Sequence, residues 1–178
     1  MQEKTLTSNR VFNGRLINLD VVEVSLESGR KARREIVRHP GAVLVLGKLP
    51  DGRFVFVRQF RKPIDQELLE VVAGTREPDE DAETCAIREM REETGYEVKT
   101  LSRMGFVYTA PGFCNERIDL FFAELSGTPE TQQTDEDETI EVILLDFNEI
   151  ESMIAQNEIH DGKTLVAWLM AKPHIVEN

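Results

Sequence analysis

Hydrophobic and polar residues alternate along residues 19–26 (LDVVEVSL), a pattern typical of a β-strand with one buried face. The turn-prone sequence ESGR and the segment RKARREIVRH come next, so we predict an antiparallel hairpin at the N-terminus. Farther along, AVLVLGKL and RFVFVRQF flank the residues Pro50, Asp51 and Gly52. This arrangement predicts a second hairpin, closed by a tight turn.

The rest of the chain mixes strands and helices. Residues 81–94 show helical periodicity without internal glycine or proline, and Gly95 is well placed to end that helix. Further strands are predicted at residues 67–73, 98–108, 118–125 and 140–145, and further helices at residues 148–156 and 163–171. A polar, acidic loop covers residues 128–138. Because strands and helices do not alternate strictly, we predict an α+β fold with a mixed sheet and packed helices.

Composition narrows the class of protein. The chain has 178 residues, 40% hydrophobic and 30% charged, as expected for a soluble globular domain. No apolar run approaches the roughly 20 residues that span a bilayer, and MQEKTLTSNR lacks the apolar core of a signal peptide. Two cysteines, Cys85 and Cys114, suggest neither a disulfide framework nor a zinc site, so we expect a cytoplasmic protein. The net charge of -12, without a basic patch, argues against nucleic-acid partners, and no membrane partner is expected.

Three carboxylates share one face of the helix predicted at residues 81–94. Glu89, Glu92 and Glu93 lie at about 0°, -60° and +40° around the helix axis. Each like-charged pair costs about 0.2–0.5 kcal/mol, and Arg88 and Arg91 are not expected to cancel this on the same face. A divalent cation such as magnesium, which prefers hard oxygen ligands, would relieve the repulsion. The alternative is a solvated helix with ordinary ion pairs.

The other positions of this helix suggest how it packs. Ile87 and Met90 are expected to anchor it in the core. The small residues Ala82, Cys85 and Ala86 lie on the acidic face and would let a neighbouring segment approach closely. Cys85 is expected to be a core residue and not a nucleophile, because no activating base is near it in the sequence.

The segment GTREPDEDAETCAIREMREETGY resembles the Nudix box, G-x5-E-x7-R-E-U-x-E-E-x-G-U, where U is a bulky apolar residue. Nine residues stand at its specified positions: Gly74, Glu80, Arg88, Glu89, Met90, Glu92, Glu93, Gly95 and Tyr96. The resemblance implies a metal-dependent pyrophosphohydrolase of the Nudix superfamily, with a mixed sheet sandwiched between helices (α/β/α). It further implies Mg²⁺ as the cofactor, with Mn²⁺ as a substitute.

The resemblance also implies a role for each matching residue. Glu89, Glu92 and Glu93 match the metal-binding glutamates, and the carbonyl of Ala73 is a further candidate ligand. Structural roles are expected for Gly74 in a tight turn, for Glu80 and Arg88 as an ion pair, and for Gly95 as a helix cap. In the acidic loop, Glu136 is favoured as the base that activates water and Glu138 as an additional metal ligand, although the two could be exchanged. With Glu93 they form the expected catalytic set.

Sequences outside the box resemble the ADP-ribose pyrophosphatase subgroup. VVAGT is similar to the ELPAG-like segment that precedes the box in this subgroup, although Val72 replaces the usual proline. YTAPGFCNE is similar to the subgroup's loop around Pro111, although Ala110 stands where serine is common. DGKTLVAWLMA is similar to the subgroup's D-x-K-T-L helix. ADP-ribose is therefore the leading candidate substrate, giving AMP and ribose 5-phosphate. The substrate-binding residues implied are Arg58, Arg61, Glu70, Pro111, Gly112 and Glu116. Phe12, Tyr108 and Phe113 are expected to be packing residues and not adenine stackers.

Two alternatives remain open at this point. A nucleotide-sugar diphosphatase of other preference, for instance for GDP-mannose, would use the same scaffold. A non-catalytic Nudix-like binding domain would be expected to lack box carboxylates, and all of them are present. We expect residues 1–38 to form an N-terminal hairpin subdomain and residues 39–178 the hydrolase domain. Members of this subgroup commonly form homodimers through N-terminal strands, so the resemblance implies a homodimer. It also implies a small nucleotide-sugar substrate.

Overall fold

The computed structural model describes residues 2–133 and 139–176. The predicted catalytic residues Glu136 and Glu138 lie outside these described residues. The chain forms two compact units: residues 1–41 together with 107–118, and residues 42–106 together with 119–178. The first is called the N-terminal unit and the second the larger unit.

The N-terminal unit is built on a three-stranded antiparallel sheet in the order β1-β2-β3. The predicted hairpin is confirmed as β2 (Asn18–Leu26) and β3 (Lys31–Arg38). The strand β1 (Glu3–Asn13) was not predicted, because all of its residues are exposed and its sequence carries no buried apolar face. Residues 107–118 join this unit, where Cys114 forms a parallel bridge with Val37.

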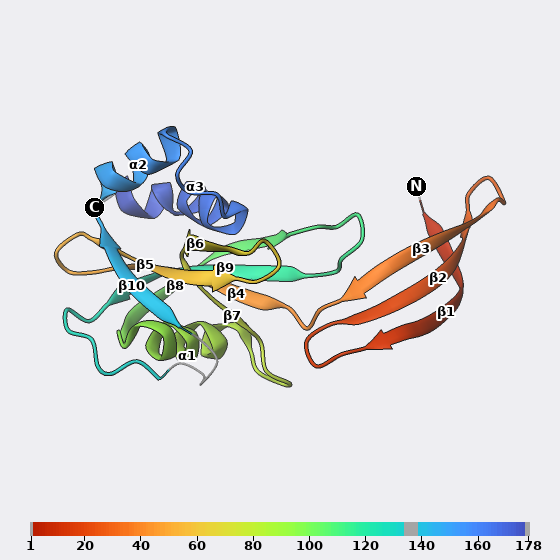
Figure 1. The fold of residues 1–178 in the computed structure, drawn as a ribbon, viewed down its shortest axis with the longest axis horizontal. Coiled ribbons are helices and arrows are strands. Elements are labelled where there is room, and N and C mark those ends of the chain that lie inside the picture. The colour runs from red at the N-terminus through yellow and green to blue at the C-terminus, as the bar shows by residue number, and fades with distance from the viewer. Residues whose placement is uncertain (1, 134–138, 177–178) are drawn as a thin grey trace. The chain divides into compact units, whose positions relative to one another are not determined.

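The larger unit contains a seven-stranded mixed sheet, ordered β10-β5-β4-β9-β8, with β6 paired to β5 and β7 paired to β4. Its strands are β4 (Ala42–Lys48), β5 (Phe54–Arg61), β6 (Gln66–Glu70), β7 (Val72–Thr75), β8 (Val98–Tyr108), β9 (Arg117–Leu125) and β10 (Ile140–Leu145). Helix α1 (Ala82–Thr94) covers one face of the sheet. Helices α2 (Phe147–Ala155) and α3 (Gly162–Val176) cover the other (Figure 1). The predicted helix–sheet–helix sandwich of an α+β fold is thereby confirmed.

The strands β4 and β5 form the centre of this sheet. Residues 43–46 of β4 and 54–57 of β5 are almost completely buried, since helices cover both faces and a fully buried strand can be apolar at every position. The predicted hairpin turn between them is confirmed, with Gly52 at φ +91°. The single strand expected at residues 67–73 is instead two strands, β6 and β7, which separate at Val71 and pair with different neighbours.

Helix α1 begins and ends as its sequence predicts. The side chain of Asp81 accepts hydrogen bonds from the backbone N–H groups of Glu83 and Thr84, which satisfies donors of the first turn. At the other end Gly95 adopts a left-handed conformation with φ +74°. Met90 is buried in the core as expected, but the prediction for Ile87 is wrong, because this residue is 46% exposed. Within the described part of the chain, no helix is long and apolar enough to cross a membrane.

Candidate active site

The acidic face of α1 is turned toward the sheet, and its small residues make this possible. Cys85 and Ala86 are fully buried, so β4 and β7 can approach that face of the helix. Burial decreases outward along the glutamates: side-chain exposure is 13% for Glu89 and 38% for Glu92, whereas the whole residue Glu93 is 5% exposed. The carboxylates therefore lie at the edge between the helix and the sheet, and they do not form a uniformly solvated surface.

Gly74 provides the space in which Glu89 lies. A Cβ atom added to Gly74 would stand 1.8 Å from Cδ of Glu89 and 2.0 Å from its Oε1. Gly74 belongs to strand β7, where it pairs with Val43, and its φ is not among the positive values of the chain. The prediction that this glycine serves a turn with unusual backbone angles is therefore wrong. The missing side chain is needed because the carboxylate of Glu89 occupies its place.

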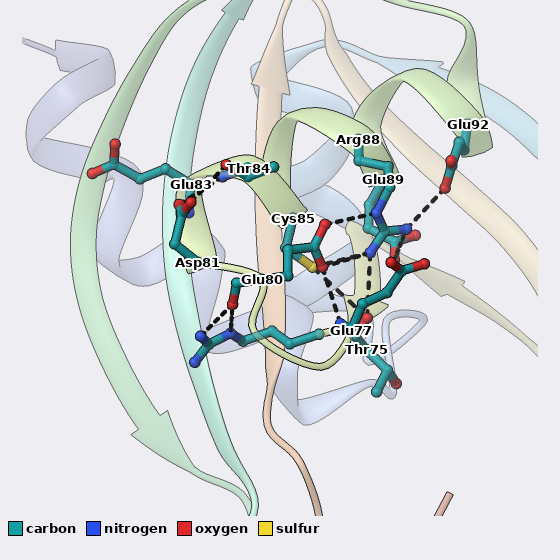
Figure 2. A network of polar contacts seen from close by, with 11 residues as sticks. Thr75, Glu77, Glu80, Asp81, Glu83, Thr84, Cys85, Arg88, Glu89 and Glu92 are labelled. Carbon is teal, nitrogen blue, oxygen red and sulfur yellow. Dashed lines mark hydrogen bonds and ion pairs between the residues drawn. The ribbon is translucent and has the colours of Figure 1, made fainter. Parts of the chain in front are cut away.

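Arg88 is the centre of a network of ion pairs on this face (Figure 2). Its Nε and Nη2 donate to the two carboxylate oxygens of Glu80 at 2.8 and 2.9 Å. Its Nη1 donates to Oε1 of Glu89 at 2.8 Å and to Oε2 of Glu92 at 2.9 Å. One guanidinium thus contacts three carboxylates, so a single positive charge offsets part of the repulsion without cancelling it, as expected.

Glu80 receives further support from its own loop. Its carboxylate accepts the backbone N–H of Glu77 at 3.0 Å, and its carbonyl accepts the guanidinium of Arg76. The hydrogen bonds from Arg88 lower the pKa of Glu80 to about 2, against the opposing effect of burial. The same pairing raises the pKa of Arg88. The loop before α1 is thereby fixed to the middle of the helix through charge-assisted hydrogen bonds.

A short segment closes the C-terminal end of α1. The backbone N–H groups of Glu130 and Gln133 donate to the carbonyls of Gly95 and Glu92 at 2.8 and 2.9 Å, and the side-chain amide of Gln132 donates to the carbonyl of Glu93. These bonds satisfy carbonyls that the helix itself leaves without partners. Beside them a pocket of about 330 Å³ is lined by Thr84, Ile87, Arg88, Arg91, Glu92 and Gln133.

The donor chemistry of this face suits a divalent cation. Glu89, Glu92 and Glu93 present hard carboxylate oxygens, the ligand type that magnesium and manganese take, and Ala73 precedes Gly74 in the facing strand. Among residues 2–133 and 139–176 no three His, Cys, Asp or Glu side chains are gathered as a ready ligand cluster. The guanidinium of Arg88 is the cation that holds Glu89 and Glu92 in this arrangement. The residues fit the metal chemically, with Arg88 as the resident counter-charge.

The two arginines predicted to bind substrate lie in different surroundings. Arg58 pairs with Glu141 at 2.9 Å on the exposed surface. Arg61 forms a two-pronged ion pair with Glu70, whose side chain is fully buried. Lys163 also contacts Glu70, and it pairs with Asp161. The sequence predicted no role for Lys163 and Asp161, although both belong to the DGKTL segment that resembles the D-x-K-T-L helix of the subgroup.

The predicted residues Pro111, Gly112 and Glu116 belong to the N-terminal unit. Pro111 and Gly112 line a pocket of about 440 Å³ within this unit, together with Arg34, Arg38, Tyr108 and Phe113 among others. Glu116 accepts a hydrogen bond from the hydroxyl of Thr109 at 2.6 Å. Phe12, Tyr108 and Phe113 are each more than half exposed, so the expectation that they are packing residues is wrong as far as the core is concerned.

Cys85 is placed as expected. Its side chain is buried between α1 and the sheet, and burial raises the pKa of its thiol to about 12. The thiolate, which is the nucleophilic form, is therefore scarce at neutral pH. The site offers carboxylates and not a cysteine for hydrolytic chemistry.

Comparison with known proteins agrees with this arrangement. Residues 38–169 match the NUDIX domain. This chain belongs to the NUDIX family. ADP-ribose pyrophosphatase from Bacillus subtilis is 40% identical over 94% of this chain and 91% of its own length. Methanol dehydrogenase activator from Bacillus methanolicus is 40% identical over 93% and 90%, and GDP-mannose pyrophosphatase from Yersinia enterocolitica is 35% identical over 95% and 92%.

A solved structure supports the fold independently of sequence. The crystal structure of ADP compounds hydrolase aligns with a TM-score of 0.85 over 98% of this chain and 95% of that chain, at 18% sequence identity. The predicted membership of the Nudix superfamily and the predicted Nudix hydrolase are confirmed by these matches. Hydrolases of this family depend on divalent metal ions, in keeping with the carboxylate face of α1.

Proposed function

We propose that this NUDIX hydrolase cleaves the diphosphate of a nucleoside diphosphate linked to a small moiety, with ADP-ribose as the preferred substrate. The products would be AMP and ribose 5-phosphate. The observation that carries the proposal is the packed carboxylate face of α1, where Glu89 fills the space left by Gly74 and Arg88 joins Glu80, Glu89 and Glu92. The likeness to an ADP-ribose pyrophosphatase, at 40% identity over nearly the whole chain, supports the choice of substrate.

Magnesium is the proposed cofactor, with manganese as a substitute. The residues that would hold it are Glu89, Glu92, Glu93, Glu138 and the carbonyl of Ala73. A bound divalent cation neutralises phosphate charge and lowers the pKa of water. Glutamates of the chain are proposed for the proton transfer. Glu136 is the proposed base that takes the proton of the attacking water, with Glu138 as the alternative, and Glu93 completes the catalytic set.

Six residues are proposed to recognise the substrate. Arg61, and with it Arg58, would bind phosphate oxygens, because a guanidinium pairs with phosphate through two parallel hydrogen bonds. Glu70, Pro111, Gly112 and Glu116 complete the proposed set. GDP-mannose is the second candidate substrate, favoured by the 35% identity to a GDP-mannose pyrophosphatase. A non-catalytic binding role is disfavoured, because every carboxylate of the box is present.

Product analysis tests this function directly. Purified protein is incubated with magnesium and either ADP-ribose or GDP-mannose, and the released monophosphates are identified by chromatography. We expect AMP from ADP-ribose, at a higher kcat/KM than GMP from GDP-mannose, and no product when EDTA removes the metal. Glu93→Gln should lower kcat by about 10²–10⁴-fold, the range typical of a lost acid–base group. Unchanged turnover in that variant would remove the α1 carboxylates from the mechanism.

The cellular setting and the assembly belong to the same proposal. A homodimer is proposed in which the N-terminal strands contribute to the partner's site, with residues 1–38 as the dimerising subdomain and residues 39–178 as the hydrolase domain. The protein is proposed to be cytoplasmic, which suits its two free thiols, and to have neither nucleic-acid nor membrane partners. Light scattering at micromolar concentration tests the assembly, and a monomer there would contradict it.

A further inference from the structure

Glu70 is a buried carboxylate with two cations on it. Nε and Nη2 of Arg61 donate to its two oxygens at 2.7 and 2.6 Å, and Nζ of Lys163 lies 3.4 Å from Oε2. The side chain of Glu70 has no exposed area, whereas that of Arg61 is 37% exposed. Burial of a charge is tolerated only when it is paired, so both cations contribute to keeping Glu70 in this place.

Lys163 is itself fixed by the start of helix α3. Its Nζ donates to Oδ1 of Asp161 at 2.6 Å. The other oxygen of Asp161 accepts the backbone N–H and the hydroxyl of Thr164 at 3.0 and 2.7 Å. The hydroxyl oxygen of Thr164 in turn accepts the backbone N–H of Val71 at 2.9 Å. The beginning of α3 is therefore tied to the point where β6 ends and β7 begins, next to Glu70.

The guanidinium of Arg61 is oriented by this chain of contacts. Glu70 binds it through Nε and Nη2, and Glu93 is a further carboxylate whose charge acts on it. The planar group thus has one edge held by a buried carboxylate and another directed away from it. A guanidinium held in this way loses little conformational freedom when it binds an anion, which favours binding.

We propose that Lys163 and Asp161 are positioning residues that act through Glu70 to orient Arg61 for the substrate diphosphate. The inference rests on the proposed function, in which Arg61 binds phosphate. Lys163 contacts Glu70 and Asp161 and does not itself bind the substrate. The four side chains carry two positive and two negative charges, and Glu93 adds a further negative charge near Arg61, so the proposal depends on the orientation of Arg61 and not on an excess of positive charge.

The test compares two lysines of the same helix. Lys163→Met removes the contact with Glu70 and Asp161, whereas the control Lys172→Met removes the partner of Glu151, 2.8 Å away in a separate pair. We expect Lys163→Met to raise the KM for ADP-ribose about tenfold, within the range of couplings in one ion-pair network, with kcat nearly unchanged. Lys163→Arg should restore most of the loss, and Lys172→Met should keep the KM of the wild type.

A double-mutant cycle separates positioning from direct contact. In an Arg61→Ala background the Lys163→Met substitution should have no further effect on KM, because the residue through which it acts is gone. An equal loss in both backgrounds would mean that Lys163 contacts the substrate itself, and it would overturn the proposal. An unchanged KM in Lys163→Met would overturn it as well. Asp161→Asn provides a second variant of similar volume should Lys163→Met fold poorly.

A binding measurement keeps this inference distinct from the proposed function. The affinity for inorganic pyrophosphate, measured by titration calorimetry, requires no turnover. We expect it to fall about tenfold in Lys163→Met, by the same coupling, and to stay unchanged in Lys172→Met. If the wild type does not hydrolyse ADP-ribose but this difference is found, the substrate is wrong and the positioning role holds. If hydrolysis is found but affinity and KM do not change, the positioning role is wrong.

Discussion

At the scale of single residues, the space around Gly74 is the sharpest constraint on the site. Because an added Cβ would meet the end of the flexible Glu89 side chain, Gly74→Ala should move that carboxylate while leaving the fold intact. We expect kcat to fall about 100-fold, as for other misplacements near 1 Å, with a small change in melting temperature. Gly127→Ala is the control, since its added Cβ would make only an ordinary contact with Pro50.

A Gly74→Ala enzyme with wild-type kcat would show that the position of Glu89 does not matter for turnover. A Gly74→Ala protein that fails to fold would instead show that the glycine is needed by strand β7. Circular dichroism melting of the variant and of Gly127→Ala distinguishes these two results. The measurement therefore assigns the glycine either to the chemistry or to the sheet.

The ion pair between Glu80 and Arg88 predicts a pH dependence of stability. The pKa of Glu80 is about 2 in the folded chain and 4.5 ordinarily, so its pairing stabilises the fold fully above about pH 4.5. That contribution is lost as the pH falls from 4.5 toward 2, because the carboxylate must then be protonated. At pH 7, Glu80→Gln should lower the free energy of unfolding by about 2 kcal/mol, as for a hydrogen bond to a charged group.

Urea unfolding between pH 7 and pH 3 checks this difference. The curves of the wild type and Glu80→Gln should converge below pH 4.5. Glu67→Gln makes the same chemical change at an exposed position of β6 and should give no such convergence. A difference that stays constant down to pH 3 would mean that the charge of Glu80 does not contribute to the stability of the fold.

At the scale of elements, the sequence predicted best those helices and strands that have a regular apolar pattern and a residue that marks their end. Helix α1 was predicted from the helical periodicity of residues 81–94 and from Gly95 at its end, and the structure adds Asp81 as its N-terminal cap. Strand β1 was not predicted, because it has no buried face. The break between β6 and β7 at Val71 was not predicted either, because apolar residues continue through it. The network of Arg61, Glu70 and Lys163 could not be predicted either, since it joins residues 93 positions apart.

Gly95 is needed both for its left-handed backbone conformation and for the close approach of Glu130, and substitutions at Gly95 and Gly52 can measure the two effects separately. Its φ of +74° is unfavourable for other residues, and an added Cβ would stand 2.1 Å from the carbonyl oxygen of Glu130. Gly52 has the similar φ of +91° but open space around it. We expect Gly52→Ala to cost about 1 kcal/mol of unfolding free energy from its backbone conformation alone.

Gly95→Ala should cost more than Gly52→Ala, because the segment that closes the end of α1 must also move away. Unfolding in urea gives both values, and their difference measures the close approach of residue 130 to the helix. Equal losses of unfolding free energy in the two variants would mean that the closing segment moves away from Gly95 without destabilising the fold. A larger cost accompanied by lost activity would show that the closing segment also supports the site.

At the scale of the whole molecule, charge is unevenly distributed along the chain. Residues 2–41 and 107–118 carry nine Lys and Arg against six Asp and Glu, a formal charge of +3, although the whole chain carries -12. The same N-terminal unit exposes large apolar side chains in and after β1: Leu6, Val11, Phe12, Leu16 and Ile17. A basic unit with exposed apolar residues in an otherwise acidic protein is suited to pairing with a second copy of the chain.

The proposed homodimer can therefore be tested at β1. Light scattering at micromolar concentration should give twice the 20.3 kDa of one chain for the wild type. Replacing both Val11 and Phe12 with serine should shift the mass toward that of one chain, because two apolar contacts are lost from a small interface. Leu169→Ser on α3 removes an apolar side chain of similar exposure and should leave the dimer intact. If the doubly substituted protein keeps the dimer mass, the chains pair elsewhere, since a contact through β1 could not survive the loss of its largest exposed side chain.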